Sequence, residues 1–177
     1  MFSASVSLAD LQKNLINKLT ATHTLSFDFK QKISNKEETG NCFIKYPLLM
    51  KCNYQNLKQK TIISNGKTVA VIKKKYKKIY YYPIKLTPLF FILKKEKIMN
   101  LIRKNQPTEI NENFIEFEFT DQKTNKVKIL FDKNSLEFKG WKTKDSYSND
   151  VSFTINNLKI NNQIMDDFFK IPNEEDL

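Results

Sequence analysis

Large apolar residues alternate with polar ones over much of the chain between Leu25 and Ile155. Period-2 alternation places successive side chains on opposite faces of a strand, so each such segment has one apolar and one polar face. The apolar positions are unusually aromatic and branched: Phe27 and Phe29; Ile115, Phe117 and Phe119; Val127, Ile129 and Phe131; Val151, Phe153 and Ile155. Few other elements are available to cover such a face, so a bound apolar ligand is one explanation for it.

The strand segments predicted from this alternation are short and follow one another closely. Asn65-Gly66 separates two of them and favours a tight hairpin, because both residues tolerate a positive φ. Connections this short join antiparallel strands, since a parallel crossover needs about a dozen residues or more. The predicted strands are 24–33, 40–46, 49–55, 59–64, 67–73, 76–82, 113–120, 126–132, 135–142 and 149–159, in a sheet that covers residues 24–82 and 109–160.

Residues 7–20 have the spacing of an amphipathic helix. Leu8, Leu11, Leu15 and Leu19 share one face of it. Ser7, followed three residues later by an acidic residue, resembles a capping box at its start. We expect this helix to pack on the sheet.

A second helical segment interrupts the strands in the middle of the chain. Pro83 and Pro88 end the first group of strands, and KEKIMNLIRK at 95–104 suits a short helix. Residues 84–104 are therefore predicted to form a helical excursion whose apolar side chains lie on the apolar face of the sheet.

The composition fits a single domain over residues 1–177, with 40% hydrophobic residues and 14 Phe. No run approaches the roughly 20 apolar residues that span a bilayer. The net charge of +11, from 30 Lys and Arg against 19 Asp and Glu, favours anionic partners. A compositional habit of an AT-rich genome is the preferred explanation of the lysine excess, because Asn, Ile and Phe are abundant as well.

Few residues carry catalytic or metal-binding chemistry. One His and two Cys make no recognisable zinc site, 3 Gly form no phosphate-binding loop, and no serine lies in a nucleophile-elbow pattern. Glu116 and Glu118 share one strand face opposite Ile115 and Phe117, so we expect them on a solvated outer face. The protein is predicted not to be an enzyme, and no catalytic residue, metal or cofactor is expected.

Cys42 and Cys52 flank a predicted hairpin whose turn lies at 46–49, which would make them near cross-strand neighbours. A disulfide between them fits an oxidising compartment. Two inert buried thiols fit the spacing as well, so the pair by itself does not decide the compartment.

The basic run KKKYKK at 73–78 joins two predicted strands beside the Asn-Gly hairpin. Lysines interleaved with an aromatic residue can bind nucleic acid through phosphate contacts and base stacking. They also protect a sheet edge from aggregation. A solvated surface is the preferred interpretation, a transient contact with a membrane surface or an acidic partner is the next, and a nucleic-acid-binding domain is the least favoured. We expect no nucleic-acid partner.

The order of the motifs is more informative than any one of them. After the helix come SFDFKQKI (26–33), Gly40 with CFIKYP (42–47), IISNGKTV (62–69), KIYYYPIKLTPLFFIL (78–93) and FFKIP…D (168–176). This order resembles the periplasmic outer-membrane lipoprotein carrier family, LolA, over nearly the whole chain. That family shows an F-x-x-x-F-x-Q-like first strand, a G-x-hydrophobic-x-hydrophobic-x-R-P segment, an S-D-G-K hairpin, a T-P-L-x-x-L segment and a terminal F-x-x-P…D.

The resemblance implies a mainly β fold, an incomplete, half-open antiparallel β-barrel with an α-helical lid over its concave apolar face. It implies a monomeric periplasmic carrier that shields the acyl chains of lipoproteins. Such a carrier accepts acylated lipoproteins from an inner-membrane lipoprotein-releasing transporter and delivers them to an outer-membrane lipoprotein receptor. Residues 1–8 form no intact signal peptide, so we expect one to have been removed. A lipid-binding receptor or sensor on the same fold is the alternative.

The expected lipid-binding side chains are the large apolar residues of the concave face and of the lid. Ordinary core packing explains any single one of them equally well. They are Phe27, Phe29, Ile44, Tyr46, Met50, Ile115, Phe117, Phe119, Ile129 and Phe131 on the sheet, and Leu89, Phe90 and Phe91 in the lid region.

The chain departs from the family pattern at three positions. Tyr46 stands where the family has a lid-locking Arg, Cys52 where it has a Trp, and Asn65 where it has the hairpin Asp. A lid latch at Tyr46 would have no charge and a single hydroxyl group to donate to a lid carbonyl.

Overall fold

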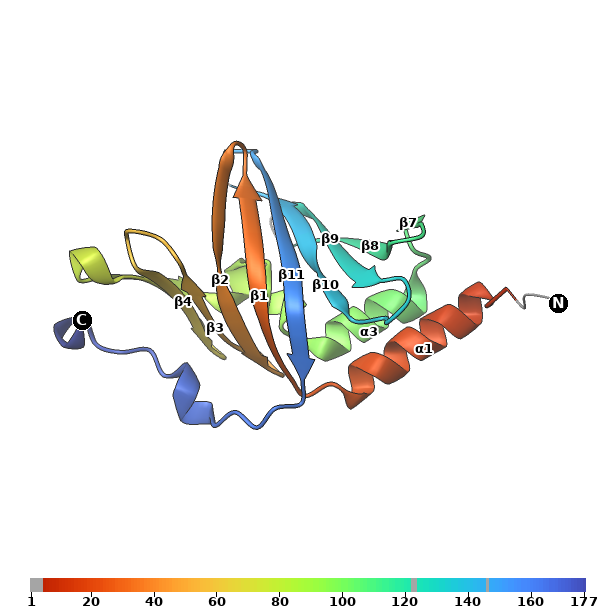
Figure 1. Cartoon of the computed structure of the whole chain (residues 1–177), viewed down its shortest axis with the longest axis horizontal. Coiled ribbons are helices and arrows are strands. Elements are labelled where there is room, and N and C mark those ends of the chain that lie inside the picture. Colours follow the sequence, from red (N-terminus) through yellow and green to blue (C-terminus); the bar gives the residue numbers. More distant parts are fainter. Residues whose placement is uncertain (1–4, 122–123, 146) are drawn as a thin grey trace.

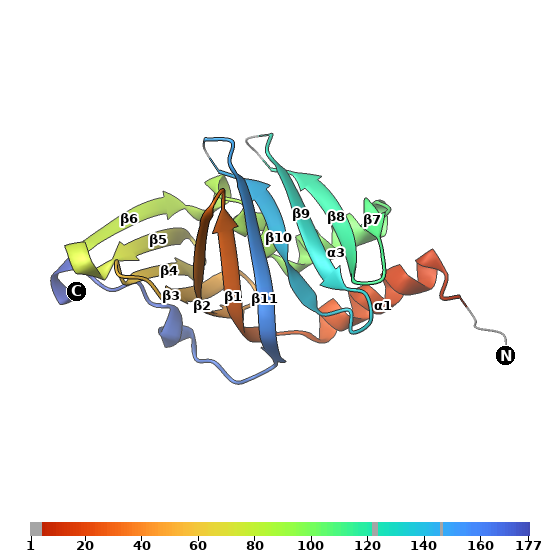
Figure 2. The same cartoon turned by 45° about the horizontal axis from the view of Figure 1, so that its top comes forward.

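The computed structural model describes residues 5–121, 124–145 and 147–177. One antiparallel sheet dominates it, with 11 strands in the order β6-β5-β4-β3-β2-β1-β11-β10-β9-β8-β7 (Figure 2). The strands are β1 (Thr24–Ile33), β2 (Lys36–Lys45), β3 (Leu49–Tyr54), β4 (Lys60–Asn65), β5 (Thr68–Lys73), β6 (Lys78–Pro83), β7 (Glu109–Ile110), β8 (Phe114–Thr120), β9 (Lys126–Asp132), β10 (Phe138–Lys144) and β11 (Asp150–Ile160).

The sheet is strongly curved and stays open. Strands β6 and β7 form its two edges in the described residues, so the sheet does not close on itself. At its centre β1 pairs with β2 on one side and with β11, from the far end of the chain, on the other. The predicted half-open antiparallel barrel is confirmed, although the alternation by itself indicated pairing only between strands that are neighbours in sequence.

The two longest helices of the described residues lie side by side on the inner side of the sheet (Figure 1). Helix α1 (Leu8–Ala21) begins at Ser7, whose side chain accepts a hydrogen bond from the Asp10 backbone N–H, and buries Leu11, Leu15 and Leu19. The excursion between the two groups of strands contains α2 (Leu89–Ile92) and α3 (Lys95–Lys104). No helix of the described residues is long and apolar enough to cross a membrane.

Helix α3 is tied to α1 by a side chain. The Gln12 amide nitrogen donates to the backbone oxygens of Ile102 and Asn105, at 2.7 and 2.8 Å. These carbonyls are at the end of α3 and lack intrahelical partners, so Gln12 satisfies them from the neighbouring helix. Helices α1 and α3 are therefore joined to each other. Helices α2 and α3 together are called the lid below.

Local turn chemistry moves some strand boundaries from their predicted places. Asp132 accepts hydrogen bonds from the backbone N–H groups of Asn134 and Ser135, both at 2.9 Å, and this turn delays the start of β10 until Phe138.

The prediction that Glu116 lies on a solvated outer face is wrong, because this residue is only 3% exposed. The segment that contains the short strand β7 folds back there, and Thr108 donates to a Glu116 carboxylate oxygen at 2.9 Å.

The polar outer face of the sheet also carries an apolar cluster that the alternation did not predict. Ile63, Ala70, Ile72 and Ile79 gather there on β4, β5 and β6. Residues 161–177, here called the C-terminal strap, run along this side with two short 3₁₀ helices at Asp166–Phe169 and Glu174–Asp176 (Figure 1). Ile171 and Leu177 of the strap pack against the cluster, so the strap shields it from water.

Cys42 and Cys52 form a disulfide. They are directly opposite each other on β2 and β3, with their Cα atoms 4.1 Å apart. The sequence allowed either a disulfide or two inert buried thiols, and the structure shows the disulfide.

Candidate functional site

The thirteen predicted lipid-binding residues all belong to one hydrophobic cluster between the sheet and the helices. Nine of them are buried and are called the concave wall: Phe27, Phe29, Ile44, Met50, Ile115, Phe117, Phe119, Ile129 and Phe131. Tyr46, Leu89, Phe90 and Phe91 are partly buried and pack against it. The structure thus brings the predicted residues together, and their contact with a ligand stays a prediction.

Aromatic rings form a continuous row across the middle of the sheet. Trp141 stacks on Phe153 with ring centroids 4.0 Å apart, and Phe153 stacks on Phe29 at 4.7 Å. Phe29 then meets Tyr54 edge to face at 4.8 Å. The strand register explains the row, because β10, β11, β1, β2 and β3 are neighbours and these rings share the inner face.

The lid fills most of the concave side with its own side chains. Phe91 stacks on Phe119 of the sheet with ring centroids 3.5 Å apart. Ile92, Ile98 and Ile102 are buried in the same cluster. The lid therefore plugs most of the concave face, and a long apolar ligand must displace lid side chains.

A cavity of about 190 Å³ remains between the start of the lid and the sheet. This is smaller than the roughly 300–1,000 Å³ of typical small-molecule pockets. We call it the under-lid cavity; its lining residues are Gln31, Met50, Cys52, Tyr54, Ile62, Pro88, Leu89, Trp141, Thr143, Val151 and Phe153. The closed lid thus leaves room for part of an acyl chain, and a complete chain requires the lid to move.

Of the thirteen predicted residues, Met50 and Leu89 line this cavity. Several of its other residues were missed, although a signal for them exists. Trp141 and Phe153 occupy inner-face positions of the alternating pattern, and so do the polar residues Gln31 and Thr143. A polar residue at an apolar-face position of the alternating pattern is the sequence signal that could have identified Gln31 and Thr143 as lining residues.

Tyr54 and Gln31 form a polar pair in the lining of the under-lid cavity. The Tyr54 hydroxyl group donates to the Gln31 side-chain oxygen at 2.6 Å. Burial, reinforced by the negative charge of Glu38, raises the pKa of the Tyr54 hydroxyl above its ordinary value. Tyr54 therefore stays neutral and acts as a hydrogen-bond donor.

Tyr46, the position of the missing latch residue, lies at the opposite end of the cluster. Its ring packs beneath the Lys95 ammonium, which is 5.8 Å from the ring centroid, and burial raises the pKa of its hydroxyl. The turn after it holds the lid instead, because the Leu48 backbone N–H donates to the Leu93 oxygen at 2.8 Å. A backbone contact thus joins this hairpin to the end of α2.

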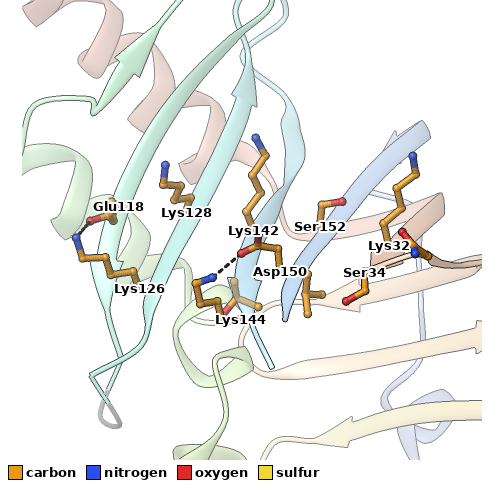
Figure 3. Close-up of a pocket in the computed structure, with 12 residues that line it drawn as sticks. Lys32, Ser34, Glu118, Lys126, Lys128, Lys142, Lys144, Asp150 and Ser152 are labelled. Carbon is orange, nitrogen blue, oxygen red and sulfur yellow. Dashed lines mark hydrogen bonds and ion pairs between the residues drawn. The ribbon is translucent and has the colours of Figure 1, made fainter. Parts of the chain in front are cut away.

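A larger hollow of about 610 Å³ lies over β1 and β8 to β11, and its residues are mostly polar. Lysines from β1, β9 and β10 surround it (Figure 3), with Lys126 paired to Glu118 at 3.5 Å and Lys144 paired to Asp150 at 2.7 Å. Lys32, Lys128 and Lys142 complete its basic lining. This lysine-lined hollow has the character of a contact for anions rather than for acyl chains.

The run at 73–78 forms the connection between β5 and β6, and Tyr76 in it is 54% exposed. In the described residues, no group of three or more His, Cys, Asp or Glu could hold a metal ion. The structure thus offers an apolar site under a lid and two basic surfaces, of which the lysine-lined hollow shares Thr143 and Val151 with the lining of the under-lid cavity.

Comparison with known proteins agrees with this geometry. A family model for the outer membrane lipoprotein carrier protein LolA matches residues 20–172. An outer-membrane lipoprotein carrier protein of Francisella tularensis subsp. tularensis is 27% identical over 198 residues, which covers 100% of this chain and 92% of the relative.

Solved structures share the fold at low sequence identity. An uncharacterized conserved protein from Thermus thermophilus has a TM-score of 0.55 at 8% identity, over 94% of this chain and 95% of that chain. A chain of the Pseudomonas aeruginosa MucA/MucB complex has a TM-score of 0.51 at 9% identity, over 93% of this chain and 62% of that chain.

The matched residues include the whole sheet and the lid, and therefore every residue of the concave wall. The full-length relative carries the same family name. The chain belongs to the outer membrane lipoprotein carrier protein LolA family.

Proposed function

We propose that this protein binds the acyl chains of lipoproteins between the concave wall and the lid and carries them across the periplasm. Carriers of its family are periplasmic and are not enzymes. The finer steps proposed are acceptance from an inner-membrane lipoprotein-releasing transporter and delivery to an outer-membrane lipoprotein receptor. The carrier works as a monomer and needs no cofactor.

The observation that carries the proposal is the plugged concave face. A sheet with a continuous apolar inner face is covered by a short lid that adds Phe91, Ile92 and Ile98 to the same cluster. The lid is joined to the sheet region by few polar contacts, of which the one from Leu48 to Leu93 is a single backbone hydrogen bond. Such a cover can be exchanged for another apolar occupant without unfolding the sheet.

The energetics suit binding followed by release. Each buried methylene contributes about 0.8 kcal/mol, so ten methylenes contribute about 8 kcal/mol. Displacing the lid side chains offsets part of this gain, because their own apolar contacts are lost. The net affinity is then low enough for a receptor to remove the cargo.

Displacement of the fluorescent apolar probe bis-ANS tests acyl binding. A diacylated lipopeptide should displace the probe at micromolar concentration, and the same peptide without acyl chains should not. Failure of the acylated peptide to displace the probe would contradict the proposed function.

A transfer experiment tests the finer steps. Protein loaded with lipopeptide is mixed with vesicles that contain or lack an outer-membrane lipoprotein receptor. Transfer only to the receptor vesicles supports a carrier. Binding without transfer to either vesicle would favour a lipid sensor on the same fold.

The lysine-lined hollow and the run at 73–78 support a transient contact with anionic membrane surfaces. Co-sedimentation with anionic vesicles that falls steeply as salt rises is the expected behaviour. Equal sedimentation with neutral and anionic vesicles would rule this contact out. Oligonucleotides serve as the competing polyanion, and no comparable binding to them is expected.

A further inference from the structure

The under-lid cavity is apolar along most of its lining but has polar side chains at two separate places. Gln31 on β1, Tyr54 on β3 and Thr143 on β10 supply them. The Tyr54 hydroxyl donates to the Gln31 side-chain oxygen at 2.6 Å. This bond occupies the acceptor atom of Gln31 and leaves its amide N–H groups to serve as donors.

Thr143 presents the second donor. Its Oγ1 atom is buried and has no hydrogen-bond partner in the described part of the chain. A buried hydroxyl without a partner carries an uncompensated desolvation penalty, and such groups are rare in folded proteins. A ligand that brings a hydrogen-bond acceptor to this place would remove the penalty.

The strand register separates the two donors by a strip of apolar surface. Gln31 pairs with Phe153 of β11, and Thr143 pairs with Val151 of the same strand. Phe153 and Val151 therefore lie between the two polar groups on the inner face. A ligand that reaches both donors must have two acceptors, one on each side of this strip, with apolar groups against the strip itself.

The chemistry of the lining selects the kind of acceptor. Among the described residues that line the cavity there is no Lys or Arg, so a carboxylate would be buried without a countercharge. Ester and amide carbonyls are neutral acceptors and suit the two donors. They are also the groups that join acyl chains to a glycerol or an amine.

We propose that Gln31 and Thr143 donate hydrogen bonds to the ester or amide carbonyls that join the acyl chains to the cargo. The proposal rests on the proposed function, since it takes binding of acyl chains in this cavity as given. One carbonyl meets Gln31 and the other meets Thr143, and the chains extend from there beneath the lid. The site thus recognises carbonyl-linked lipids in preference to plain hydrocarbon chains or free fatty acids.

Two lipopeptides that share one peptide test this preference. The first carries S-[2,3-bis(palmitoyloxy)propyl]cysteine, and the second is its bis-hexadecyl ether, which lacks both carbonyls. The wild-type protein should bind the ester about tenfold more tightly than the ether, because the ether leaves the donors unpaired. Titration of the bis-ANS complex with each lipopeptide gives the ratio.

Variants assign the donors. Thr143→Val and Gln31→Met should each lower the ester-to-ether ratio to roughly threefold, and the double variant should bring it close to one. Ser152→Ala is the matched control, because Ser152 is next to Val151 on β11 and faces the lysine-lined hollow. Its ratio should equal that of the wild type.

The outcomes separate this inference from the proposed function. Equal binding of ester and ether by the wild type overturns the inference and leaves acyl binding intact. A wild-type preference that survives in the double variant overturns it too. If the wild type binds neither lipopeptide, the proposed function itself is contradicted.

Thermal unfolding is the folding control for the variant. Thr143→Val removes an unpaired hydroxyl, so its thermal midpoint should be at least that of the wild type, which excludes misfolding as the cause of a changed ratio.

Discussion

At the scale of single residues, Glu38 is the clearest buried charge near the site. It is 7% exposed on β2, and its carboxylate pairs with Lys60 at 3.0 Å and accepts from Asn56 at 2.7 Å. Burial by itself would raise the pKa of Glu38, but hydrogen bonds and positive charge from Lys60, with Asn56 and Lys36, lower it overall. The same Lys60 ammonium lies 3.9 Å from the centroid of the Tyr54 ring, so the pair also supports this residue of the cavity lining.

A pH series of unfolding experiments tests the role of Glu38. A carboxyl group whose folded-state pKa is lowered stabilises the protein above its unfolded pKa, and this contribution disappears as pH falls through the folded value. Glu38→Gln should cost about 1–3 kcal/mol at pH 7, because Lys60 loses its charged partner. The difference from wild type should shrink as pH falls below 4.5, the ordinary value for this group. Urea unfolding measures the difference in free energy of unfolding at each pH, with Glu37→Gln at an exposed position as the control. A difference that does not depend on pH would show that ionisation of Glu38 is not the cause.

At the scale of elements, the hairpin of β2 and β3 combines several features of the site. Its turn gives the lid the hydrogen bond from Leu48 to Leu93, and Cys52 of its disulfide is part of the cavity lining. The cross-link closes a short loop of 10 residues in sequence separation. It stabilises the fold chiefly by restricting the unfolded chain.

Reduction should therefore weaken this hairpin measurably. We expect loss of the disulfide to cost roughly 2–3 kcal/mol for a loop of this size. Denaturant unfolding with and without dithiothreitol measures the cost. The double variant Cys42→Ser, Cys52→Ser should have the stability of the reduced protein, and dithiothreitol should not change it. An unfolding midpoint of the wild type that reduction leaves unchanged would contradict the prediction.

The lid is the element whose stability sets access to the site. Lys95, at the start of α3, donates to the backbone oxygens of Thr22 at 2.8 Å and Thr20 at 3.4 Å, near the end of α1. A cation there interacts favourably with the negative end of the helix dipole. This contact ties the lid to α1 in the closed state.

Lys95→Met should loosen the lid and leave the sheet intact. A loss of about 1 kcal/mol corresponds to roughly a fivefold rise in the open population. Hydrogen exchange across 89–104 should speed up accordingly, and bis-ANS should bind more tightly. The same change at exposed Lys104 is the control, and equal exchange in both variants would show that the Lys95 contact does not hold the lid.

At the scale of the whole molecule, the two faces of the sheet have different covers. The inner face carries the exchangeable lid, whereas the outer face carries the C-terminal strap. Phe169 of the strap is 1% exposed, and the Ile79 backbone N–H donates to a Glu174 carboxylate oxygen at 2.9 Å. The strap therefore stabilises the half of the sheet that ends at the edge strand β6.

Removing the anchor of the strap should affect stability and not the site. Phe169→Ala should cost about 3–5 kcal/mol, as expected for a fully buried Phe. Phe168→Ala, at a position that is 37% exposed, should cost distinctly less. Thermal unfolding compares the two, and lipopeptide binding below the unfolding transition should stay as in wild type; a loss of binding in a folded Phe169 variant would mean that the strap and the site are coupled.

The sequence by itself determined ten of the eleven strands of the described residues, all but the two-residue β7, together with the position of the lid and the membership of the concave wall. Period-2 alternation is a local property, and it dictates which side chains share a face whatever the strands later pair with. Phe27, Phe117 and Phe131 could therefore be grouped before any pairing was known. The ordered motifs pointed to the family for the same reason, since they follow local turns and faces.

Only the tertiary structure decided how those faces meet. The pairing of β1 with β11 joins residues far apart in sequence, and it alone sets Gln31 and Thr143 on either side of one apolar strip. The backbone contact from Leu48 to Leu93 and the strap on the outer face likewise depend on packing between distant segments. Alternation specifies the face of a residue but not its neighbours across strands, so the cavity left by the lid could not be read from the pattern.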